Sequence, residues 1–357
     1  MEFSSPDLDF RGKRFLLVGG AGFIGHNLAL RLSQHGAEVG ILDSLQVNNL
    51  LSLHDTHSAP NEHLLYEAML QERLKLLQSA GVTMYVEDAR DYHRLGRRFN
   101  DFQPDVVVVL AAVSHASRAN KDPRTTLDHS YRSLENALDN SRGRVDHFIF
   151  MSSSMVYGNF QTETVDETTP CEPLGIYGAV KLGNEKLIAA YGNVFDLPYT
   201  IIRPSALYGQ RCISRRVGQI FIENAIRGRE LVIQGDGEDR IDFTYIDDFT
   251  QGILRAASRD ESKGQIFNIT YGHAHTLNEI AELVTSEFPG TRIRHTERPA
   301  LVPERGTLNV SKARELIGYD PEFPVSRGFL KYIAWYRELF ANFDADFLSG
   351  IGAQLNE

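Results

Sequence analysis

Residues 19–25, Gly19-Gly20-Ala21-Gly22-Phe23-Ile24-Gly25, decide the fold of this chain. An apolar run at 15–18 precedes them, and apolar residues at helical spacing follow at 27–32. The order is therefore strand, glycine turn and helix, in which the backbone can approach a pyrophosphate and the helix N-terminus points at it. Because glycines also form turns that bind nothing, this interpretation needs support from the next strand.

That strand, predicted at residues 38–43, ends in Asp43, about 20 residues beyond the glycines. A carboxylate at this position can accept hydrogen bonds from an adenosine ribose, and it repels a 2′-phosphate. No arginine follows in Ser44 and Leu45. The sequence therefore predicts NAD as the cofactor in preference to NADP. The structural alternative is an Asp that only caps a turn after the strand.

The composition is that of an ordinary globular protein. The 357 residues, 42% of them hydrophobic and 24% charged, can hold one large domain or two modest ones. A net charge of −10 argues against nucleic acid as a partner, and neither a membrane-spanning run nor a signal peptide is evident. Cys171 and Cys212 form no disulfide or metal motif, and the twelve His show no metal-ligand spacing. We expect a cytoplasmic protein without a metal.

Strands alternate with helices over the first 203 residues. Further strands are predicted at 82–86, 105–110, 147–151 and 199–203, and helices at 61–80, at 123–140 and from 177 onward. The unbroken apolar run at 105–110 is typical of a parallel strand buried on both faces. The pattern predicts an α/β fold, a doubly wound parallel sheet with the glycine turn and the ends of the fourth and fifth strands along one crevice.

After residue 203 the elements become shorter, and loops rich in Arg, Gly and Pro separate them. Helices are expected at 217–227, 247–257, 276–288, 311–317 and 325–340, and strands at 231–233 and 242–245. We therefore expect a dinucleotide-binding domain at 1–203 and a smaller mixed α/β lobe at 204–345 that binds the substrate. Segments near 242–270 are expected to return to the first domain, and residues 346–357 form a tail.

Tyr177 and Lys181 form a Y-x-x-x-K motif at the start of the helix after the fifth strand. In a helix the two side chains lie on one face, a turn apart. Any amphipathic helix with one Tyr and one Lys shows this spacing, but here it lies on the crevice side of the sheet. The fifth strand ends in Ser152-Ser153-Ser154 at the same edge. We expect one of these serines to be catalytic and the others to cap the strand.

The chemistry of such a group follows from the pKa of tyrosine. A free Tyr has a pKa of about 10, so roughly one in a thousand is phenolate at pH 7, and moving the pKa to 7 needs about 4 kcal/mol. The Lys181 ammonium and an oxidised nicotinamide would both favour the phenolate. Tyr177 would then take a proton from a hydroxyl while hydride leaves the same carbon for NAD, with a Ser hydroxyl orienting the oxygen.

Taken together, these motifs resemble the extended short-chain dehydrogenase/reductases, specifically the nucleotide-sugar epimerases and dehydratases. The resemblance runs from about Arg14 to Trp335. It rests on residues 19–25 with Asp43, Asp88, 110–112, 151–158, 177–181, 203–204 with 208–209, 235–237 with 242–243 and 247–248, and 305–306. It implies a Rossmann domain with tightly held NAD, a lobe that grips a nucleotide diphosphate sugar, and homodimers formed through two helices of each subunit.

The family's functional residues carry over motif by motif. The resemblance implies three catalytic residues: Ser153, which lies four residues before Tyr157, the base Tyr177, and Lys181, which holds the nicotinamide ribose. The cofactor-binding residues that it implies are Gly19, Gly22, Phe23, Ile24, Gly25, Asp43, Asp88, Ala111, Tyr177 and Lys181. The expected substrate-binding residues are Ser114, Ser153, Arg211, Arg216 and Arg305. Arg305 resembles the arginine that grips the diphosphate, for which bidentate geometry is suited.

Two departures from the family pattern bear on the reaction. Dehydratases and decarboxylases place an acidic residue just after the catalytic hydroxyl, where this chain has Ser154 and Met155. This favours 4-epimerisation, which needs only oxidation, rotation of a 4-keto sugar and return of the hydride. The substrate grip also differs, because Ala206 replaces a frequent Asn and the family's Arg before Asp-Phe is displaced to Arg240.

A basic cluster, Arg211 with Arg215 and Arg216, follows the sixth strand. It either binds an anionic sugar such as a uronate or forms a solvated loop, and the helix at 61–80 resembles an insertion in uronate epimerases. The leading hypothesis is an NAD-dependent nucleotide-sugar 4-epimerase acting on UDP-glucuronate or a UDP-hexose. The alternatives are a dehydratase, decarboxylase or ketosugar reductase, or a non-catalytic NAD-binding scaffold.

Overall fold

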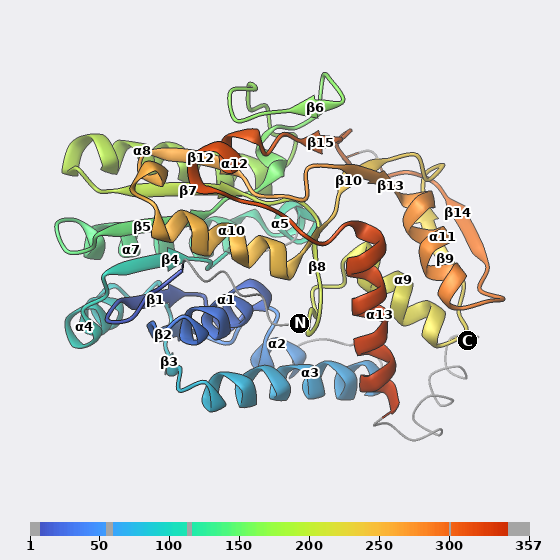
Figure 1. The fold of residues 1–357 in the computed structure, drawn as a ribbon, viewed down its shortest axis with the longest axis horizontal. Helices are drawn as coiled ribbons and strands as arrows, with labels where there is room; N and C mark the ends of the chain where they lie inside the picture. Colours follow the sequence, from blue (N-terminus) through green and yellow to red (C-terminus); the bar gives the residue numbers. More distant parts are fainter. Residues whose placement is uncertain (1–7, 55–59, 113–115, 300, 342–357) are drawn as a thin grey trace.

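The computed structural model describes residues 8–54, 60–112, 116–299 and 301–341. Its centre is a seven-stranded, wholly parallel sheet in the order β12-β7-β5-β4-β1-β2-β3 (Figure 1). The strands are β1 (Arg14–Val18), β2 (Glu38–Asp43), β3 (Thr83–Val86), β4 (Val106–Val109), β5 (His147–Met151), β7 (Tyr199–Arg203) and β12 (Gln265–Asn268). The predicted Rossmann-type sheet is confirmed. The strand order reverses between β1 and β4, which is where open α/β sheets bind their ligands.

Helices cover both faces of this sheet. One layer contains α1 (Phe23–Gln34) and α10 (Ile246–Ser258), and the other contains α4 (Tyr92–Phe102), α7 (Ser133–Ser141) and α8 (Ile176–Phe195). Along β1, Phe15 and Leu17 belong to the core under the first layer, whereas Leu16 and Val18 belong to the core under the second. Burial on both faces explains why the strands are continuously apolar.

The expected helix at 123–140 forms as three successive segments. These are α6 (Pro123–Leu127), a π-helical turn η1 (Asp128–Arg132) and α7, preceded by α5 (Ala116–Lys121). The helix expected at 61–80 is confirmed as α3 (Pro60–Ser79), which follows the short α2 (Leu50–His54). Figure 1 shows α3 below α1, and α13 (Val325–Ala341) beside the end of α3 that is away from β3.

Outside the central sheet, the described chain has four two-stranded pairs. They are β8 (Leu207–Tyr208) with β11 (Thr244–Tyr245), β9 (Leu231–Gln234) with β14 (Ile293–Thr296), β10 (Arg240–Asp242) with β13 (Ala274–Thr276), and β6 (Thr164–Val165) with β15 (Thr307–Leu308). The helices here are α9 (Val217–Ile226), α11 (Leu277–Glu287), α12 (Ser311–Ile317) and α13. The single strand expected at 242–245 was wrong, because buried Phe243 separates β10 from β11 and each pairs with a different strand.

Two short helical turns complete the described fold. They are η2 (Ser154–Val156), two residues after β5, and η3 (Asp260–Ser262), before β12. Within the described ranges, no helix is both long and apolar enough to cross a membrane.

Candidate active site

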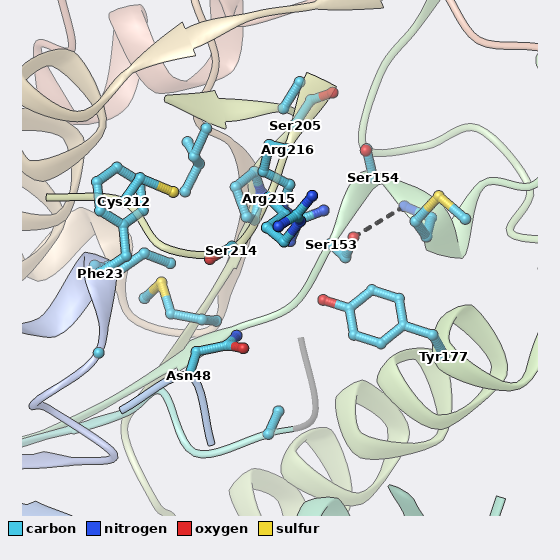
Figure 2. Close-up of a pocket in the computed structure, with 18 of the residues that line it drawn as sticks. Phe23, Asn48, Ser153, Ser154, Tyr177, Ser205, Cys212, Ser214, Arg215 and Arg216 are labelled. Atoms are coloured by element: carbon cyan, nitrogen blue, oxygen red, sulfur yellow. Dashed lines mark hydrogen bonds between the residues drawn. The ribbon is translucent and has the colours of Figure 1, made fainter. Parts of the chain in front are cut away.

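A cavity of about 960 Å³ opens at the carboxyl ends of β1, β2, β4 and β5. Its far wall comes from the loop after β8, from α9, β9 and β10, and from residues 298–299, 301–303 and 305. Figure 2 shows that Ser153 and Tyr177 on one side face the loop of Ser214, Arg215 and Arg216 on the other. Segments far apart in the sequence therefore meet around one space.

The glycine turn forms the floor of this cavity. Gly19 has a φ of +80°, and a Cβ there would lie 2.5 Å from the Ala111 backbone nitrogen. A Cβ on Gly25 would lie 2.3 Å from the Gly20 carbonyl oxygen, so only glycine lets α1 start this close to the turn. A Cβ on Gly22 would meet nothing closer than 3.8 Å, yet Gly22 lines the cavity. Gly19 and Gly25 therefore allow the close backbone packing of the turn, whereas Gly22 leaves room in the cavity above it.

Asp43 lies at the end of β2, in the cavity wall beside this turn. Its carboxylate accepts hydrogen bonds from the backbone N–H groups of Ala21 (2.9 Å) and Leu45 (2.7 Å). Burial raises the pKa of Asp43, and these two N–H groups act against that shift. The glycine turn itself thus fixes the carboxylate, and together they form a cradle whose shape and donors fit NAD.

Asp88 follows β3 and also lines the cavity. Arg90 donates hydrogen bonds to the Asp88 carboxylate from two guanidinium nitrogens, at 2.6 and 3.0 Å. Its third guanidinium nitrogen donates to Asp128 of the π-helical turn at 2.7 Å. The pKa of Asp88 is lowered, because these bonds outweigh its burial. Asp88 therefore reaches the cavity as a fixed anion. Ala111, Phe23 and Ile24 line the same space.

Ser153, Tyr177 and Lys181 converge on the opposite wall. Ser153, 8% exposed, is the second residue after β5 and accepts a hydrogen bond from the Met155 N–H at 3.2 Å. Tyr177 lies in the first turn of α8 and points its hydroxyl into the cavity beside Ser153 (Figure 2). The Lys181 ammonium donates to the Met151 carbonyl at 2.6 Å and lies 5.9 Å from the centre of the Tyr177 ring.

The electrostatics of these residues differ from the sequence-based expectation. Burial raises the pKa of Tyr177, and the charge of Arg216 and the hydroxyl of Ser153 only partly oppose it. Burial also lowers the pKa of Lys181 to about 8, against the charge of Glu185. The protein's own groups therefore do not bring the pKa of Tyr177 toward 7. That shift requires a further positive charge in the cavity, which an oxidised nicotinamide would carry.

A buried network holds this wall in place. Glu185, one turn beyond Lys181, forms a two-pronged ion pair with Arg203 at 2.6 and 3.0 Å and accepts a hydrogen bond from the Ser152 hydroxyl. Arg203 also donates to the Tyr157 hydroxyl at 3.0 Å, which in turn donates to Asn268 of β12. Ser152 thus joins the strand ends to α8, consistent with the structural role expected for two of the three serines.

The far wall is cationic. Arg215, Arg216 and Arg305 line the cavity, and so does Arg298, which is paired with Asp239 at 2.9 Å. Arg305 makes no hydrogen bond or ion pair with any other residue in the described ranges. Its burial and the charge of Arg216 lower its pKa to about 10. An anionic ligand in the cavity could accept the hydrogen bonds that this half-buried guanidinium offers.

Arg211 departs from its expected position. Its guanidinium points away from the cavity and donates to His26 at 3.0 Å, to Glu72 at 3.0 Å and to Asn27 at 3.2 Å. Arg211 does not line the cavity, so the structure does not bring it together with Arg216 and Arg305, the other predicted substrate-binding arginines. The physical reason is that α1 and α3 supply acceptors for all three of its donor groups. Ser114, also predicted to bind substrate, lies outside the described residues, as does His115.

The structure adds cavity-lining residues that sequence reasoning missed, among them Asn48, Ser205 and Ser214. Ser205 follows β7 at the carboxyl end of the sheet, so its position alone could have indicated it. Ser214 lies inside the predicted basic cluster. Asn48 has a φ of +49° in a loop with no distinctive pattern, and nothing in the sequence could have identified it.

A glycine turn at the switch point of a parallel sheet, with a Ser, a Tyr and a Lys across the cavity, defines a dinucleotide-dependent enzyme of the short-chain dehydrogenase type. The model of the NAD dependent epimerase/dehydratase family matches residues 15–270. The chain belongs to this family, and NAD is its cofactor.

Individual relatives divide between two reactions. A putative UDP-glucose 4-epimerase of Methanocaldococcus jannaschii is 28% identical over 329 residues, covering 90% of this chain and 98% of that protein. A dTDP-glucose 4,6-dehydratase of Xanthomonas campestris pv. campestris is 24% identical over 344 residues, covering 90% and 92%. The crystal structure of the UDP-glucuronic acid 4-epimerase from Bacillus cereus, in complex with UDP-glucuronic acid and NAD, has a TM-score of 0.80 at 24% identity, covering 91% of this chain and 99% of that chain. The chain is therefore a nucleotide-sugar epimerase or dehydratase.

Proposed function

We propose that this protein is a nucleotide-sugar 4-epimerase that uses resident NAD and a transient 4-keto sugar. The observation that carries the proposal is the shared cavity, which Ser153, Tyr177 and Lys181 line together with Arg305, an arginine that has no acceptor among the described residues. A nucleotide sugar has the matching pair of features, a reactive hydroxyl and a diphosphate. We further propose that residues 204–345 supply most of the diphosphate-binding wall.

Each side chain has a separate task in this mechanism. The Tyr177 oxygen takes the proton of the sugar 4-hydroxyl and later returns it, while the Ser153 hydroxyl donates to the sugar oxygen and holds it in line. Lys181, anchored on the Met151 carbonyl, holds the cofactor ribose and keeps positive charge near Tyr177. When bound, NAD would supply the hydride acceptor that oxidation at C4 needs and the hydride donor for its reversal.

The acidic residues of the cavity favour epimerisation over elimination. Among the described lining residues they are Asp43 and Asp88 with Glu87, near the ends of β2 and β3, and Asp239, which Arg298 neutralises. None belongs to β5 or α8, where the hydroxyl-bearing residues lie. Loss of water or of carbon dioxide needs an acid and a base beside the sugar, and Ser154 and Met155 cannot provide them.

The sugar class follows from the same wall. Arg216 lines the same cavity as Tyr177 and Arg305, and its charge lowers the pKa of both. We propose that it contacts the sugar, with a UDP-hexuronate or a UDP-hexose as substrate. A carboxylate at C6 would gain a charge-assisted bond there.

Proton NMR of the purified holoenzyme with UDP-glucose, UDP-glucuronate and dTDP-glucose, without added NAD, tests the proposal. We expect one nucleotide sugar to interconvert with its 4-epimer and no NADH to accumulate. A stable 4-keto-6-deoxy product or release of carbon dioxide would refute epimerisation. Bound NAD with no turnover of any sugar would favour the non-catalytic scaffold.

Variants of the cationic wall test the binding role. Arg305→Met should raise KM for the converted sugar by about tenfold or more, because a charge-assisted bond to a phosphate contributes about 1.5–3 kcal/mol. Arg337→Met is the matched control, since Arg337 pairs with Glu287 on the surface. Equal KM values for both variants would exclude Arg305 from the substrate site.

We also propose a cytoplasmic homodimer. Its support is the family resemblance and exposed apolar side chains on α6 and α8, where Leu127 is 43% and Val194 is 69% exposed. Both cysteines are free, which suits a reducing compartment. Sedimentation equilibrium should give twice the chain mass, and Val194→Asp should shift the protein toward monomer. A monomeric wild type would contradict the dimer.

A further inference from the structure

The loop between β8 and α9 carries part of the cationic wall, and fully buried Arg73 and partly buried Arg211 hold it in place. Cys212, Ser214, Arg215 and Arg216 of this loop line the cavity. Arg211 is the residue before them and does not line it. The loop adopts a conformation that costs energy, because Arg211 and Arg215 have φ values of 61° and 52°, a region that non-glycine residues seldom occupy.

The backbone of Arg211 is clamped by α3. Arg73, one of the largest fully buried side chains, donates to the Arg211 carbonyl through Nε at 2.9 Å and through a second guanidinium nitrogen. Its third nitrogen lies 3.5 Å from the Asn48 carbonyl oxygen, in the loop after β2. One side chain of α3 therefore connects the substrate loop to a loop of the cofactor half.

The side chain of Arg211 reaches the glycine turn through two residues of α1. Its Nε–H donates to Nε2 of His26, so that nitrogen carries no proton, and the other ring nitrogen donates to the Gly22 carbonyl at 2.9 Å. In parallel, Arg211 donates to the Asn27 side-chain oxygen, whose amide nitrogen donates to the Phe23 carbonyl at 2.9 Å. Gly22 and Phe23 both line the cavity on the cofactor side.

His26 can serve in this connection only as a neutral ring. Burial, Arg73 and Arg211 together lower its pKa well below the ordinary value, so it accepts from Arg211 throughout the neutral range. The complete connection runs from the Gly22 and Phe23 carbonyls through α1 to Arg211. From there it continues along the backbone to Ser214 and Arg216.

We infer that Arg211 is a positioning residue that couples the seating of NAD on the glycine turn to the placement of the cationic substrate loop. If the turn is displaced, His26 and Asn27 move with it, and the loop loses the contacts that hold Arg216 toward the cavity. Binding of NAD and binding of a nucleotide sugar then favour one another, because coupling between two sites is reciprocal. The ligand identities rest on the proposed function, but the contacts do not.

The test is the rate at which bound NAD exchanges with isotopically labelled NAD, measured with and without saturating UDP-glucose or UDP-glucuronate. In the wild type, the sugar nucleotide should slow exchange roughly 5- to 150-fold, the usual range of such coupling. In Arg211→Met this slowing should fall to less than about threefold, because the connection is cut. Arg337→Met, a surface arginine, should behave as the wild type does.

His26→Leu tests the same connection if Arg211→Met folds poorly, because it removes only the bridge to the Gly22 carbonyl and leaves the Arg73 clamp intact. It should reduce the slowing, and His26→Gln, which keeps one donor and one acceptor, should restore part of it. A role limited to stability would lower the melting temperature and leave the slowing unchanged in all variants. That result would overturn the inference.

Turnover of the sugar nucleotide and the slowing of NAD exchange are measured independently. A wild type that shows the slowing but converts no sugar would refute the proposed reaction and support the coupling. Normal epimerisation with equal slowing in the wild type, Arg211→Met and His26→Leu would refute the coupling and support the reaction. Arg216→Met is made both in the wild type and in Arg211→Met, and its effect on KM is compared. A much smaller KM increase in the Arg211→Met background would support the inference, and equal increases in both backgrounds would contradict it.

Discussion

Two alanine substitutions in the glycine turn should separate its two roles. Gly25→Ala places a methyl group 2.3 Å from the Gly20 carbonyl oxygen and 2.5 Å from the Gly20 Cα. An ordinary contact needs about 3.5 Å, so α1 must move by about 1 Å from the turn. Every opposing atom is backbone and cannot rotate away.

The magnitude follows from three terms. Overpacking of this kind costs about 1–3 kcal/mol, and alanine returns up to about 1 kcal/mol of helix propensity, since Gly25 lies inside α1. The displaced turn also loses NAD, which contributes about 2.7 kcal/mol when its concentration is a hundred times Kd. The holoenzyme should therefore lose most of its cofactor-dependent stability.

Gly22→Ala is the contrasting variant. Its φ of −75° suits alanine, and the new methyl group meets nothing closer than 3.8 Å, so stability without NAD should change by less than about 0.5 kcal/mol. Because the methyl group enters the cavity, NAD should still be lost. The assays are NAD released per subunit and urea unfolding with and without NAD. Stoichiometric NAD and unchanged stability in Gly25→Ala would refute the reasoning.

Three further predictions concern the wall opposite the turn and the sheet. Tyr177→Phe should keep its NAD and its fold but lose about 10²–10⁴ in kcat, and retention of wild-type kcat would exclude Tyr177 as the base. Glu185→Gln should lower the free energy of urea unfolding by about 3 kcal/mol or more, because it leaves buried Arg203 without its charged partner. The surface variant Glu287→Gln should lower it by less than about 1 kcal/mol. Similar losses in the two variants would contradict the role of the buried ion pair. The pKa of buried His147 is lowered to about 4, so below pH 6.5 the unfolded chain binds more protons than the folded chain, and stability falls as pH drops toward 4. Between pH 7.5 and 5.0 this loss should be about 2 kcal/mol in the free energy of unfolding, and His147→Gln should abolish it. The same pH dependence of unfolding in that variant and in the wild type would disprove the role of His147.

The sequence predicted the elements whose signals are local. Six of the seven sheet strands have apolar runs of four or more residues or end in a distinctive motif. The edge strand β12 has only Ile266 and Phe267 as apolar residues, and no strand was predicted at its position. Its outer edge is satisfied by side chains, since Glu167 accepts from the Asn268 N–H and Lys312 donates to the Ile266 carbonyl. Such tertiary contacts leave no periodic pattern in the sequence.

The candidate site shows the same division. Ser153, Tyr177 and Lys181 could be brought together from their places at strand and helix ends, because parallel strands share one carboxyl edge. The direction of Arg211 could not, because it depends on acceptors from α1 and α3 that only the folded chain assembles. The raised pKa of Tyr177 could not be predicted for a related reason, since it follows from the burial of its hydroxyl, which only the folded chain produces.

The central claim is that hydride leaves C4 of a nucleotide sugar and returns to the same carbon. It is tested most directly with UDP-glucose and UDP-glucuronate deuterated at C4, incubated with the holoenzyme and followed by NMR. The account predicts a 4-epimer that retains the deuterium at C4, with none passing to added NAD or to solvent. Deuterium found at C6, as in a 4,6-dehydration, or in released NADH would contradict it.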